Sequence, residues 1–416
     1  MALMFKVMDA SLPNHQVTTL MSSCDWMETP SVVLDEARLR HNIERMQALA
    51  TSHHVNLRPH AKTHKTREIA TMQLAAGACG LTVSKPSEAL QFLQGDVPGL
   101  KSVVLAYPVV QSAKVQTVLE AAQKAGVEFL LTVDSPEGVD AAQKAAEACG
   151  CKLKLLIHID VGYHRVGIEE DDPRLLELAQ CIDKTDSLEF RGLLSHAGHA
   201  YRCKSVAECT EVAETERLIM VRIKEMLESN GISVPVVSVG STLTEPARKS
   251  FEGITEIRPG NYVFLDRTPV RMGLFTVQDV ALSILVTVVS SNKYNFIVDA
   301  GSKVLSSDGA RSAGEFGSSC FGLAFYEKDF ERVVNEPTQN KTLLDDGQEL
   351  VCFEVTSLSE EHGWIQKIEG VPSPAIGDHL VIVPNHSCVV SNLTDKFYVK
   401  GKEPKSWKLL SRGCTQ

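Results

Sequence analysis

The chain has 416 residues, of which 44% are hydrophobic and 23% are charged, and its formal net charge is -10 at pH 7. This length and composition are typical of a globular protein with two domains, and they exclude a chain that is mainly disordered. The acidic balance argues against nucleic acid as a partner, because non-specific binding to phosphates relies on a broad excess of Lys and Arg.

Residues 1–28 predict a local N-terminal extension. They contain Asp9, and they lack both the long apolar run of a signal peptide and the Arg-rich pattern of a transit peptide. No apolar run in the chain reaches the roughly 18 residues that a membrane helix needs, so we expect no membrane partner. The eleven cysteines are scattered and odd in number. They favour free thiols in a reducing, cytoplasmic setting.

Residues 29–270 predict a barrel domain. TPSVVLD (29–35) is a strand that could pair with the late β-strands, and a helix capped by Asp35 follows it. Short apolar strands then alternate with helical stretches whose apolar positions recur at i, i+3, i+4 and i+7. The expected strands are 56–62, 79–85, 102–108, 127–135, 152–160, 190–198, 235–241 and 256–264.

Eight strand–helix units in this length favour an α/β fold of the (β/α)8 barrel type. The alternative, an open doubly wound sheet, lacks its best signal, because no G-x-G-x-x-G turn follows the first strand. Residues 271–416 are rich in apolar strand patterns with little helical periodicity, which predicts a C-terminal all-β domain. Within it, residues 305–345 predict a long loop.

Polar residues stand at the expected carboxyl ends of the barrel strands, where barrel enzymes place their chemistry. They are Lys62, Ser84, Tyr107, Asp134, Asp160, His196, Ser241, Thr242 and Asn261. On a regular first strand, Arg58, His60 and Lys62 would share the inward face. Burial and neighbouring bases would keep Lys62 close to its neutral, nucleophilic form, as Schiff-base chemistry requires. The alternative is that Lys62 and Lys65 are surface lysines of a loop.

Three further motifs carry ligand chemistry. The small residues of VSVGST and RPGNY expose backbone N–H groups after strands seven and eight, where barrels commonly bind phosphate. In PNHSC, His386 and Cys388 are two positions apart and would point to one face of a strand. That pair suits a borderline cation, with Zn²⁺ as the first candidate. A buried thiol beside a hydrogen-bonded histidine fits the same spacing.

From Thr29 to its C-terminus, the chain resembles the eukaryotic-type D-serine dehydratases, which belong with D-threonine aldolases and alanine racemases to the fold-type III pyridoxal phosphate (PLP) enzymes. The resemblance rests on motifs that occur in this order: RPHAKTHK, GYHRVG, SHAGHAY, SVGST, RPGNYVF, EEHG and PNHSC.

The resemblance implies a role for each motif residue. Lys62 would form the Schiff base with PLP, Arg165 would lie near the phenolic oxygen and His196 against the ring. Either Tyr201 or Arg258 would face the ring nitrogen. His386 and Cys388 would bind Zn²⁺; at the cysteine position, aldolases carry an aspartate. The phosphate site would comprise Gly240, Ser241, Thr242, Gly260 and Asn261.

The implied reaction is a PLP- and zinc-dependent β-elimination that converts D-serine to pyruvate and ammonia. The alternatives are a D-threonine (β-hydroxy-D-amino acid) aldolase and a PLP carrier without catalysis, although carriers end near the barrel. The resemblance also implies a homodimer with its active site between one barrel and the partner's β domain, and it leaves open which subunit supplies the metal ligands.

Overall fold

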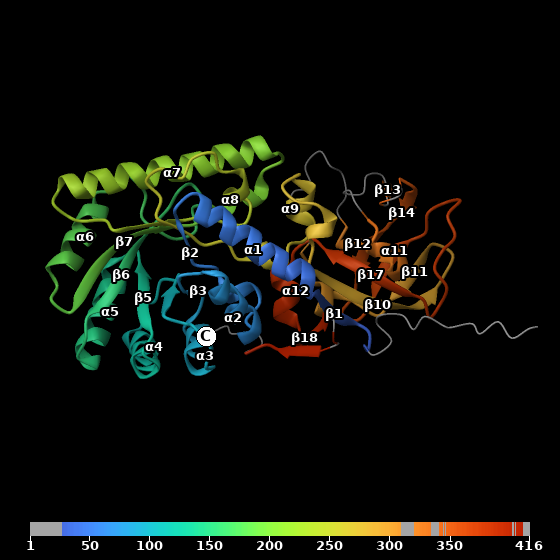
Figure 1. The fold of residues 1–416 in the computed structure, drawn as a ribbon, viewed down its shortest axis with the longest axis horizontal. Coiled ribbons are helices and arrows are strands. Elements are labelled where there is room, and N and C mark those ends of the chain that lie inside the picture. The colour runs from blue at the N-terminus through green and yellow to red at the C-terminus, as the bar shows by residue number, and fades with distance from the viewer. Residues whose placement is uncertain are drawn as a thin grey trace, which may run out of the picture.

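The computed structural model describes residues 27–308, 320–333, 341–343, 345, 347–401, 403 and 405–410. Figure 1 shows a set of parallel strands surrounded by helices beside a second unit of mainly antiparallel strands. Nearly all of the predicted N-terminal extension lies outside the described residues, as does much of the predicted loop 305–345. The described part of that loop contains a strand, Gly322–Tyr326, and a helical turn, so the prediction of a continuous loop is wrong there.

Eight parallel strands form the barrel, which confirms the predicted fold class. The last neighbours meet where His60 forms a bridge with Thr82, so the sheet closes on itself. Val104, Leu130, Leu156 and Leu194 form a small apolar cluster of their own on four adjacent strands. In spatial order the strands are β2 (Asn56–Leu57), β9 (Glu256–Ile257), β8 (Val236–Val239), β7 (Leu188–Ser195), β6 (Leu153–Ile159), β5 (Glu128–Val133), β4 (Ser102–Leu105) and β3 (Leu81–Val83).

Helices follow the strands, and several begin at a residue whose side chain accepts a backbone N–H. Before α5, the Ser135 side chain accepts a hydrogen bond from the Gly138 N–H, Pro136 occupies the first turn, and Gly150 ends the helix with φ = +60°. The helices of this half are α1 (Glu36–Ser52), α2 (Arg67–Ala76), α3 (Pro86–Gln94), α4 (Ser112–Ala125), α5 (Pro136–Cys149), α6 (Arg174–Lys184), α7 (Val206–Ser229), α8 (Thr244–Ala247) and α9 (Arg267–Arg271), with 3-10 turns η1 (Ala61–Thr63), η2 (Gly198–Arg202), η3 (Asn261–Val263) and η4 (Val277–Asp279).

The second unit is a nine-stranded, mainly antiparallel sheet. Its strand β1 comes from the N-terminal side of the barrel and pairs with β10 and β18, as the sequence suggested. In order the strands are β11 (Asn295–Val298), β16 (Gly363–Gln366), β15 (Phe353–Leu358), β12 (Gly322–Tyr326), β17 (His379–Pro384), β10 (Leu282–Ser291), β1 (Ser31–Asp35), β18 (Lys396–Lys400) and β19 (Lys405–Lys408). The remaining elements are α10 (Ser302–Leu305), α11 (Glu327–Phe330), α12 (Ser387–Leu393) and the pair β13 (Lys341–Leu343) and β14 (Glu349–Val351).

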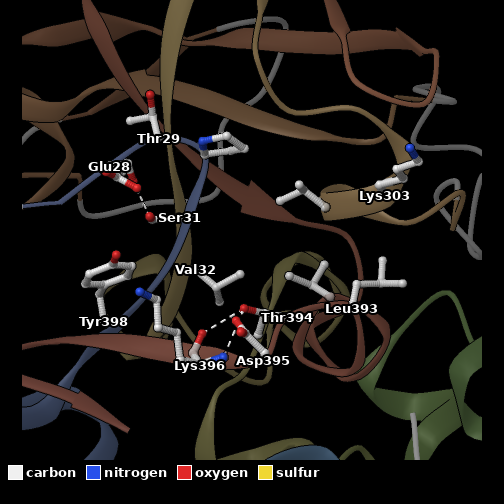
Figure 2. A pocket seen from close by; sticks show the side chains of 13 residues that line it. Glu28, Thr29, Ser31, Val32, Lys303, Leu393, Thr394, Asp395, Lys396 and Tyr398 are labelled. Carbon is white, nitrogen blue, oxygen red and sulfur yellow. Dashed lines mark hydrogen bonds between the residues drawn. The ribbon is translucent and has the colours of Figure 1, made fainter. Parts of the chain in front are cut away.

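Helix α12 connects this sheet to the barrel. It contacts the 3-10 turn η1 of the barrel at one end, because the Ser391 hydroxyl donates to the Thr63 carbonyl at 2.5 Å. The same C-terminal part of the helix, with Val390 and Leu393, borders a cavity of about 210 Å³ between β1 and β18, lined by Glu28, Lys303 and Lys396 among others (Figure 2). None of the predicted site residues lines that cavity. Among the described residues, no helix has the length and apolar character needed to cross a bilayer.

Candidate active site

A cavity of about 460 Å³ lies between the carboxyl ends of the parallel strands and the start of α12. A second cavity of about 240 Å³ shares five lining residues with it, namely His60, Lys62, Arg165, His196 and Arg258. Gly240 lines the smaller cavity, and all the other predicted site residues line the larger one: Lys62, Arg165, His196, Tyr201, Ser241, Thr242, Gly260, Asn261, His386 and Cys388. The structure therefore brings these residues together, while their chemical roles stay predictions.

The sequence predicted that Lys62 lies on the first strand, and the structure shows that it does not. Strand β2 ends at Leu57, and Lys62 lies in the 3-10 turn η1 that follows. Arg58 does not share the surroundings of Lys62, because the Arg58 guanidinium pairs with Glu256 at 2.7 Å. Burial, with Arg165 and Arg258 adding like charge, lowers the pKa of Lys62, whereas the Cys388 thiolate acts in the opposite direction. The direction of the shift favours a neutral amine.

The loop that carries Arg165 is fixed by two carboxylates. Asp160 Oδ1 accepts hydrogen bonds from the backbone N–H groups of Gly162, Tyr163 and His164 at 2.9, 3.0 and 3.0 Å. Asp134 accepts one from the Gly167 N–H at 3.0 Å. Both acids stand at predicted strand ends, and their observed contacts are with the GYHRVG loop.

His196 is held in one orientation by the backbone. Its Nδ1 lies 3.2 Å from the Gly240 carbonyl oxygen. A carbonyl only accepts hydrogen bonds, so Nδ1 carries the proton and Nε2 keeps its lone pair. Burial, followed by the charges of Lys62 and Arg165, lowers the pKa of His196 well below its ordinary value. The ring is therefore neutral near pH 7.

The predicted phosphate site contains one hydroxyl that is free to bind a ligand. Thr242 Oγ1 is buried and has no hydrogen-bond partner among the described residues. Ser241 is different, because its N–H donates to Thr244 Oγ1 at 2.9 Å and its hydroxyl lies 3.1 Å from the same atom. At Gly260 a Cβ would approach Thr63 Oγ1 to 3.0 Å, so the close fit of the two loops favours glycine.

The predicted metal ligands lie at the start of a helix. His386 is the N-cap of α12 and Cys388 lies in its first turn, so the expectation that both lie on a strand is wrong. Strand β17 ends at Pro384, and the chain turns into the helix before the pair is complete. His386 still forms a hydrogen bond with Cys388. The two donor groups are therefore adjacent despite the different geometry.

Two residues that the sequence did not reveal support this pair. Asp266 Oδ2 lies 3.1 Å from His386 Nδ1 and accepts a hydrogen bond from Asn261 Nδ2 at 2.7 Å. Thr63 Oγ1 lies 3.3 Å from Cys388 Sγ. A carboxylate behind a metal-binding histidine is the usual partner that fixes the ring. Asp266 follows the eighth strand by a few positions, and that placement is the only signal in the sequence that pointed to it.

The opposite charges of His386 and Cys388 shift the pKa values of both groups and favour the charged form of each. Burial alone would lower the pKa of His386, but the Cys388 thiolate and Asp266 raise it to about 10. Burial likewise acts to raise the pKa of Cys388, and His386 lowers it below its ordinary value. The proton held by this pair would leave when a zinc ion binds, and imidazole and thiolate are donors that Zn²⁺ prefers. The residues present therefore fit a zinc ion.

Tyr201 and Arg258, the two predicted partners of the ring nitrogen, lie in different places. The Tyr201 ring contacts the His386 ring edge to face, with centroids 5.7 Å apart. Arg258 is buried in the barrel, where it donates to Ser238 Oγ at 2.6 Å and to the Ser195 carbonyl. Arg258 lines both cavities, whereas Tyr201 lines only the larger one.

The lining also fits PLP. It combines a lysine of lowered pKa, the cationic side chains of Arg165 and Arg258, and the unpartnered hydroxyl of Thr242. A phosphate needs such donors and positive charge, and an aldehyde needs a neutral amine. His60 Nδ1 is likewise buried without a partner among the described residues.

Comparison with known proteins agrees with this arrangement. The family model of the alanine racemase N-terminal domain matches residues 34–268, and that of a serine dehydratase domain matches residues 281–400. D-threo-3-hydroxyaspartate dehydratase from Delftia sp. is 33% identical over 87% of this chain and 91% of its own length. D-serine dehydratase from Dictyostelium discoideum is 29% identical over 90% of this chain and 93% of its own length.

Solved structures give the same picture. The Delftia dehydratase structure superimposes with a TM-score of 0.78 at 31% identity, covering 92% of this chain and 97% of that one. A variant of that enzyme with a cysteine replaced by alanine is described as metal-free. The fold of D-threonine aldolase from Filomicrobium marinum also matches, with a TM-score of 0.75 at 24% identity over 94% of this chain and 97% of that one.

A closed parallel barrel with a lysine at its mouth and a separate β domain defines a fold-type III PLP enzyme. Within that class, the chain belongs to the lyase family that contains D-serine dehydratases, D-threo-3-hydroxyaspartate dehydratase and D-threonine aldolases. The predicted family and the prediction of an enzyme are thereby confirmed. The dehydratase-type C-terminal domain argues against a PLP carrier.

Proposed function

We propose that this chain is a PLP- and zinc-dependent dehydratase that converts D-serine to pyruvate and ammonia. The observation that carries the proposal is the His386–Cys388 pair, held by Asp266 and lining the same cavity as Lys62. A thiolate ligand favours zinc over the harder cations that an aspartate would suit.

Lys62 is the proposed general base. Its amine would accept the Cα proton of the substrate, and the lowered pKa keeps part of the population neutral for that task. PLP, when bound, supplies the electron sink for the charge left at Cα. His196, fixed by the Gly240 carbonyl and neutral, presents an uncharged ring face to the cofactor site.

His386 and Cys388 would hold the zinc ion in the cavity that Lys62 also lines. A zinc ion supplies Lewis-acid stabilisation to a departing hydroxide. Asp266 orients the His386 ring, and Thr63 contacts the thiolate, so both ligands are fixed before substrate arrives. Arg165, on its carboxylate-anchored loop, would neutralise the phenolic oxygen of PLP.

Product analysis tests the proposal. The purified protein is incubated with D-serine and with D-threonine, each with and without a metal chelator. We expect pyruvate from D-serine, lost with chelator and restored by zinc. Glycine and acetaldehyde from D-threonine, without pyruvate from D-serine, would instead identify an aldolase on the same scaffold.

A second candidate substrate is 3-hydroxy-D-aspartate, and Arg202 favours it. Arg202 ends the turn η2, directly after Tyr201, and it lines the larger cavity. The lining of that cavity includes no aspartate or glutamate from the described residues. A substrate with a second carboxylate would find a guanidinium partner there, whereas D-serine would not need it.

A further inference from the structure

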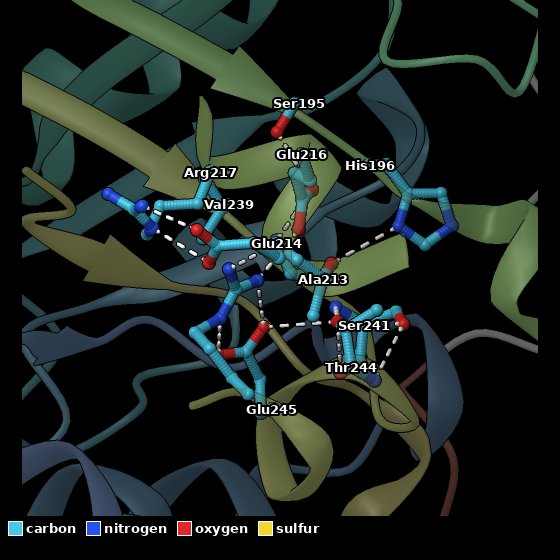
Figure 3. Close-up of polar contacts among 12 residues, drawn as sticks. Ser195, His196, Ala213, Glu214, Glu216, Arg217, Val239, Ser241, Thr244 and Glu245 are labelled. Atoms are coloured by element: carbon cyan, nitrogen blue, oxygen red, sulfur yellow. Dashed lines mark hydrogen bonds and ion pairs between the residues drawn. The ribbon is translucent and has the colours of Figure 1, made fainter. Parts of the chain in front are cut away.

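Behind the predicted phosphate site lies a cluster of three buried charges. Arg248 Nη2 contacts Glu216 of α7 at 2.7 Å and Glu245 of α8 at 3.1 Å, and all three side chains have no exposed surface (Figure 3). A further Arg248 bond reaches the Ala213 carbonyl at 2.8 Å. None of the three residues lines either cavity at the barrel mouth.

The cluster is bonded to the phosphate site through two paths. Glu216 Oε1 accepts hydrogen bonds from the Gly240 N–H at 3.2 Å and from the Ser195 hydroxyl at 2.8 Å. Glu245 Oε1 lies 3.1 Å from Thr244 Oγ1, the atom that accepts the Ser241 N–H. Both carboxylates therefore act on the backbone of the loop that would surround the phosphate.

The Gly240 peptides are fixed from two sides. Glu216 binds the N–H, and His196 Nδ1 donates to the C=O of the same residue (Figure 3). Gly240 has φ = +112°, and a Cβ at this position would lie 2.4 Å from Glu245 Oε1. Moving Glu216 or Glu245 would consequently move both the loop and the ring of His196.

The cluster sets two carboxylates against one guanidinium. Burial, with the like charge of Glu216, raises the pKa of Glu245, whereas Arg248 acts in the opposite direction. Arg258 is a further cation nearby. Burial lowers the pKa of Arg258 to about 10, while Glu256, Glu216 and Glu245 act in the opposite direction and help to keep it protonated at pH 7. Apolar residues of similar volume often stabilise a fold as well as a buried ion cluster does, so stability alone is a weak reason for these charges.

We propose that Glu216 is a positioning residue for PLP: through Gly240 it sets the phosphate-binding loop and the orientation of His196. The proposal rests on the proposed function, because it requires that PLP occupies this cavity. Glu216 acts through its hydrogen bonds to Gly240 and Ser195, and Glu245 acts on the same loop through Thr244.

Two variants test this role in the full-length holoenzyme. Glu216→Gln keeps the shape but removes the charge that holds Arg248. Thr244→Val keeps the volume and leaves the ion pairs intact, and it removes the hydroxyl that links Glu245 to the N–H, hydroxyl and carbonyl groups of Ser241. Glu128→Gln is the control at the opposite end of the barrel, where the half-exposed Glu128 pairs with Lys154 and accepts a hydrogen bond from Ser102 Oγ at 2.9 Å.

The readouts are the PLP dissociation constant, the phosphorus NMR shift of bound PLP and the unfolding temperature of the cofactor-free protein. We expect the dissociation constant to rise at least tenfold in Glu216→Gln and about threefold in Thr244→Val, with a changed phosphorus shift in both, and to stay unchanged in Glu128→Gln. Wild-type affinity and an unchanged shift in folded Glu216→Gln would overturn the role of Glu216, and the same result in Thr244→Val would overturn that of Glu245. An equal loss in Glu128→Gln would overturn both. Wild-type protein that binds no PLP would instead refute the proposed function.

Discussion

The two ends of the barrel differ in how they use buried charge. At the amino end of the strands, Arg58 pairs with Glu256 at 2.7 Å and donates to Ser102 Oγ at 2.8 Å, and Ser102 in turn donates to Glu128. At the carboxyl end, Thr242 Oγ1 and the Nδ1 atoms of His60 and His158 are buried without partners among the described residues.

The difference indicates that buried polar groups at the amino end serve stability, whereas those at the carboxyl end serve function. Buried polar atoms normally find partners, because an unpaired one costs about 1–3 kcal/mol. The network of Arg58, Glu256 and Ser102 at the amino end meets that rule within the protein, whereas the carboxyl end leaves donors and acceptors for a ligand. Substitutions at the first end should therefore change folding, and substitutions at the second should change binding and turnover.

The largest expected effect is at the carboxyl end. Cys388→Ala should lower turnover of D-serine roughly 10³-fold, about 4 kcal/mol, because no thiolate remains to hold the zinc ion. Bound zinc should fall with it, while PLP content stays at the wild-type level. Elemental analysis, PLP absorbance and pyruvate formation measure the three quantities.

The control is Cys79→Ala, a thiol at the amino end whose Sγ lies 3.5 Å from Glu256. It should retain turnover and zinc. Wild-type turnover in zinc-free Cys388→Ala protein would refute the role of the metal.

Arg58→Met should mainly affect stability. It leaves Glu256 buried without its ion pair, so the free energy of unfolding should fall by roughly 3–5 kcal/mol while kcat and KM of the folded protein stay within about twofold. Urea unfolding of the cofactor-free protein and steady-state kinetics measure this. Arg222→Met, at the exposed pair with Glu170, should cost less than about 1 kcal/mol. A large rise in KM for Arg58→Met would contradict the idea that the amino end serves stability and the carboxyl end serves binding and turnover.

The pH dependence of stability should also differ between the ends. Burial, with Arg258 and Arg165, lowers the pKa of His158 from 6.5 to about 3. Below pH 6.5 the unfolded chain therefore binds a proton that the folded chain does not, and stability falls as the pH falls, by about 2 kcal/mol for this residue at pH 5. The pKa of Glu256 is lowered by Arg58 and Ser238 despite its burial, so its stabilising effect is lost only below about pH 4.5.

Unfolding of the cofactor-free protein between pH 7 and pH 5 tests this. His158→Gln should flatten the loss of stability, and the exposed control His164→Gln should leave it unchanged. An identical pH slope in His158→Gln and wild type would contradict the prediction.

The smallest expected effect concerns substrate choice. Arg202→Gln should raise KM for D-threo-3-hydroxyaspartate about tenfold, or roughly 1.4 kcal/mol, because the second carboxylate loses its charged partner. KM for D-serine should change less than twofold, and Arg202→Lys should restore part of the difference. Equal changes for both substrates would exclude Arg202 as a determinant of specificity.

The sequence predicted local features well and tertiary neighbours poorly. Strand–helix alternation gave the barrel, and the spacing of PNHSC placed His386 and Cys388 side by side. The sequence predicted a strand over 56–62, but the observed strand covers only Asn56–Leu57, because the chain forms a 3-10 turn at Ala61–Thr63. His386 and Cys388 were placed on a strand, since periodicity alone does not show where a strand ends and a helix begins.

Glu216 had no local signal that connected it to the site, and Asp266 had only its place a few residues after the eighth strand. Asp266 meets His386 from 120 positions away in the sequence, and Glu216 meets Gly240 across α7 and β8. Their neighbours in the sequence are ordinary loop and helix residues. Only packing identifies which buried carboxylate stands behind which ligand.

The sequence by itself determined the class of fold, the lysine at the barrel mouth and the adjacent pair of His386 and Cys388, because these depend on periodicity, residue type and short spacing. The tertiary structure decided which polar groups are satisfied within the protein and which remain free for a ligand. That distinction depends on hydrogen bonds between residues far apart in the chain, such as Arg58 with Glu256 and Asp266 with His386.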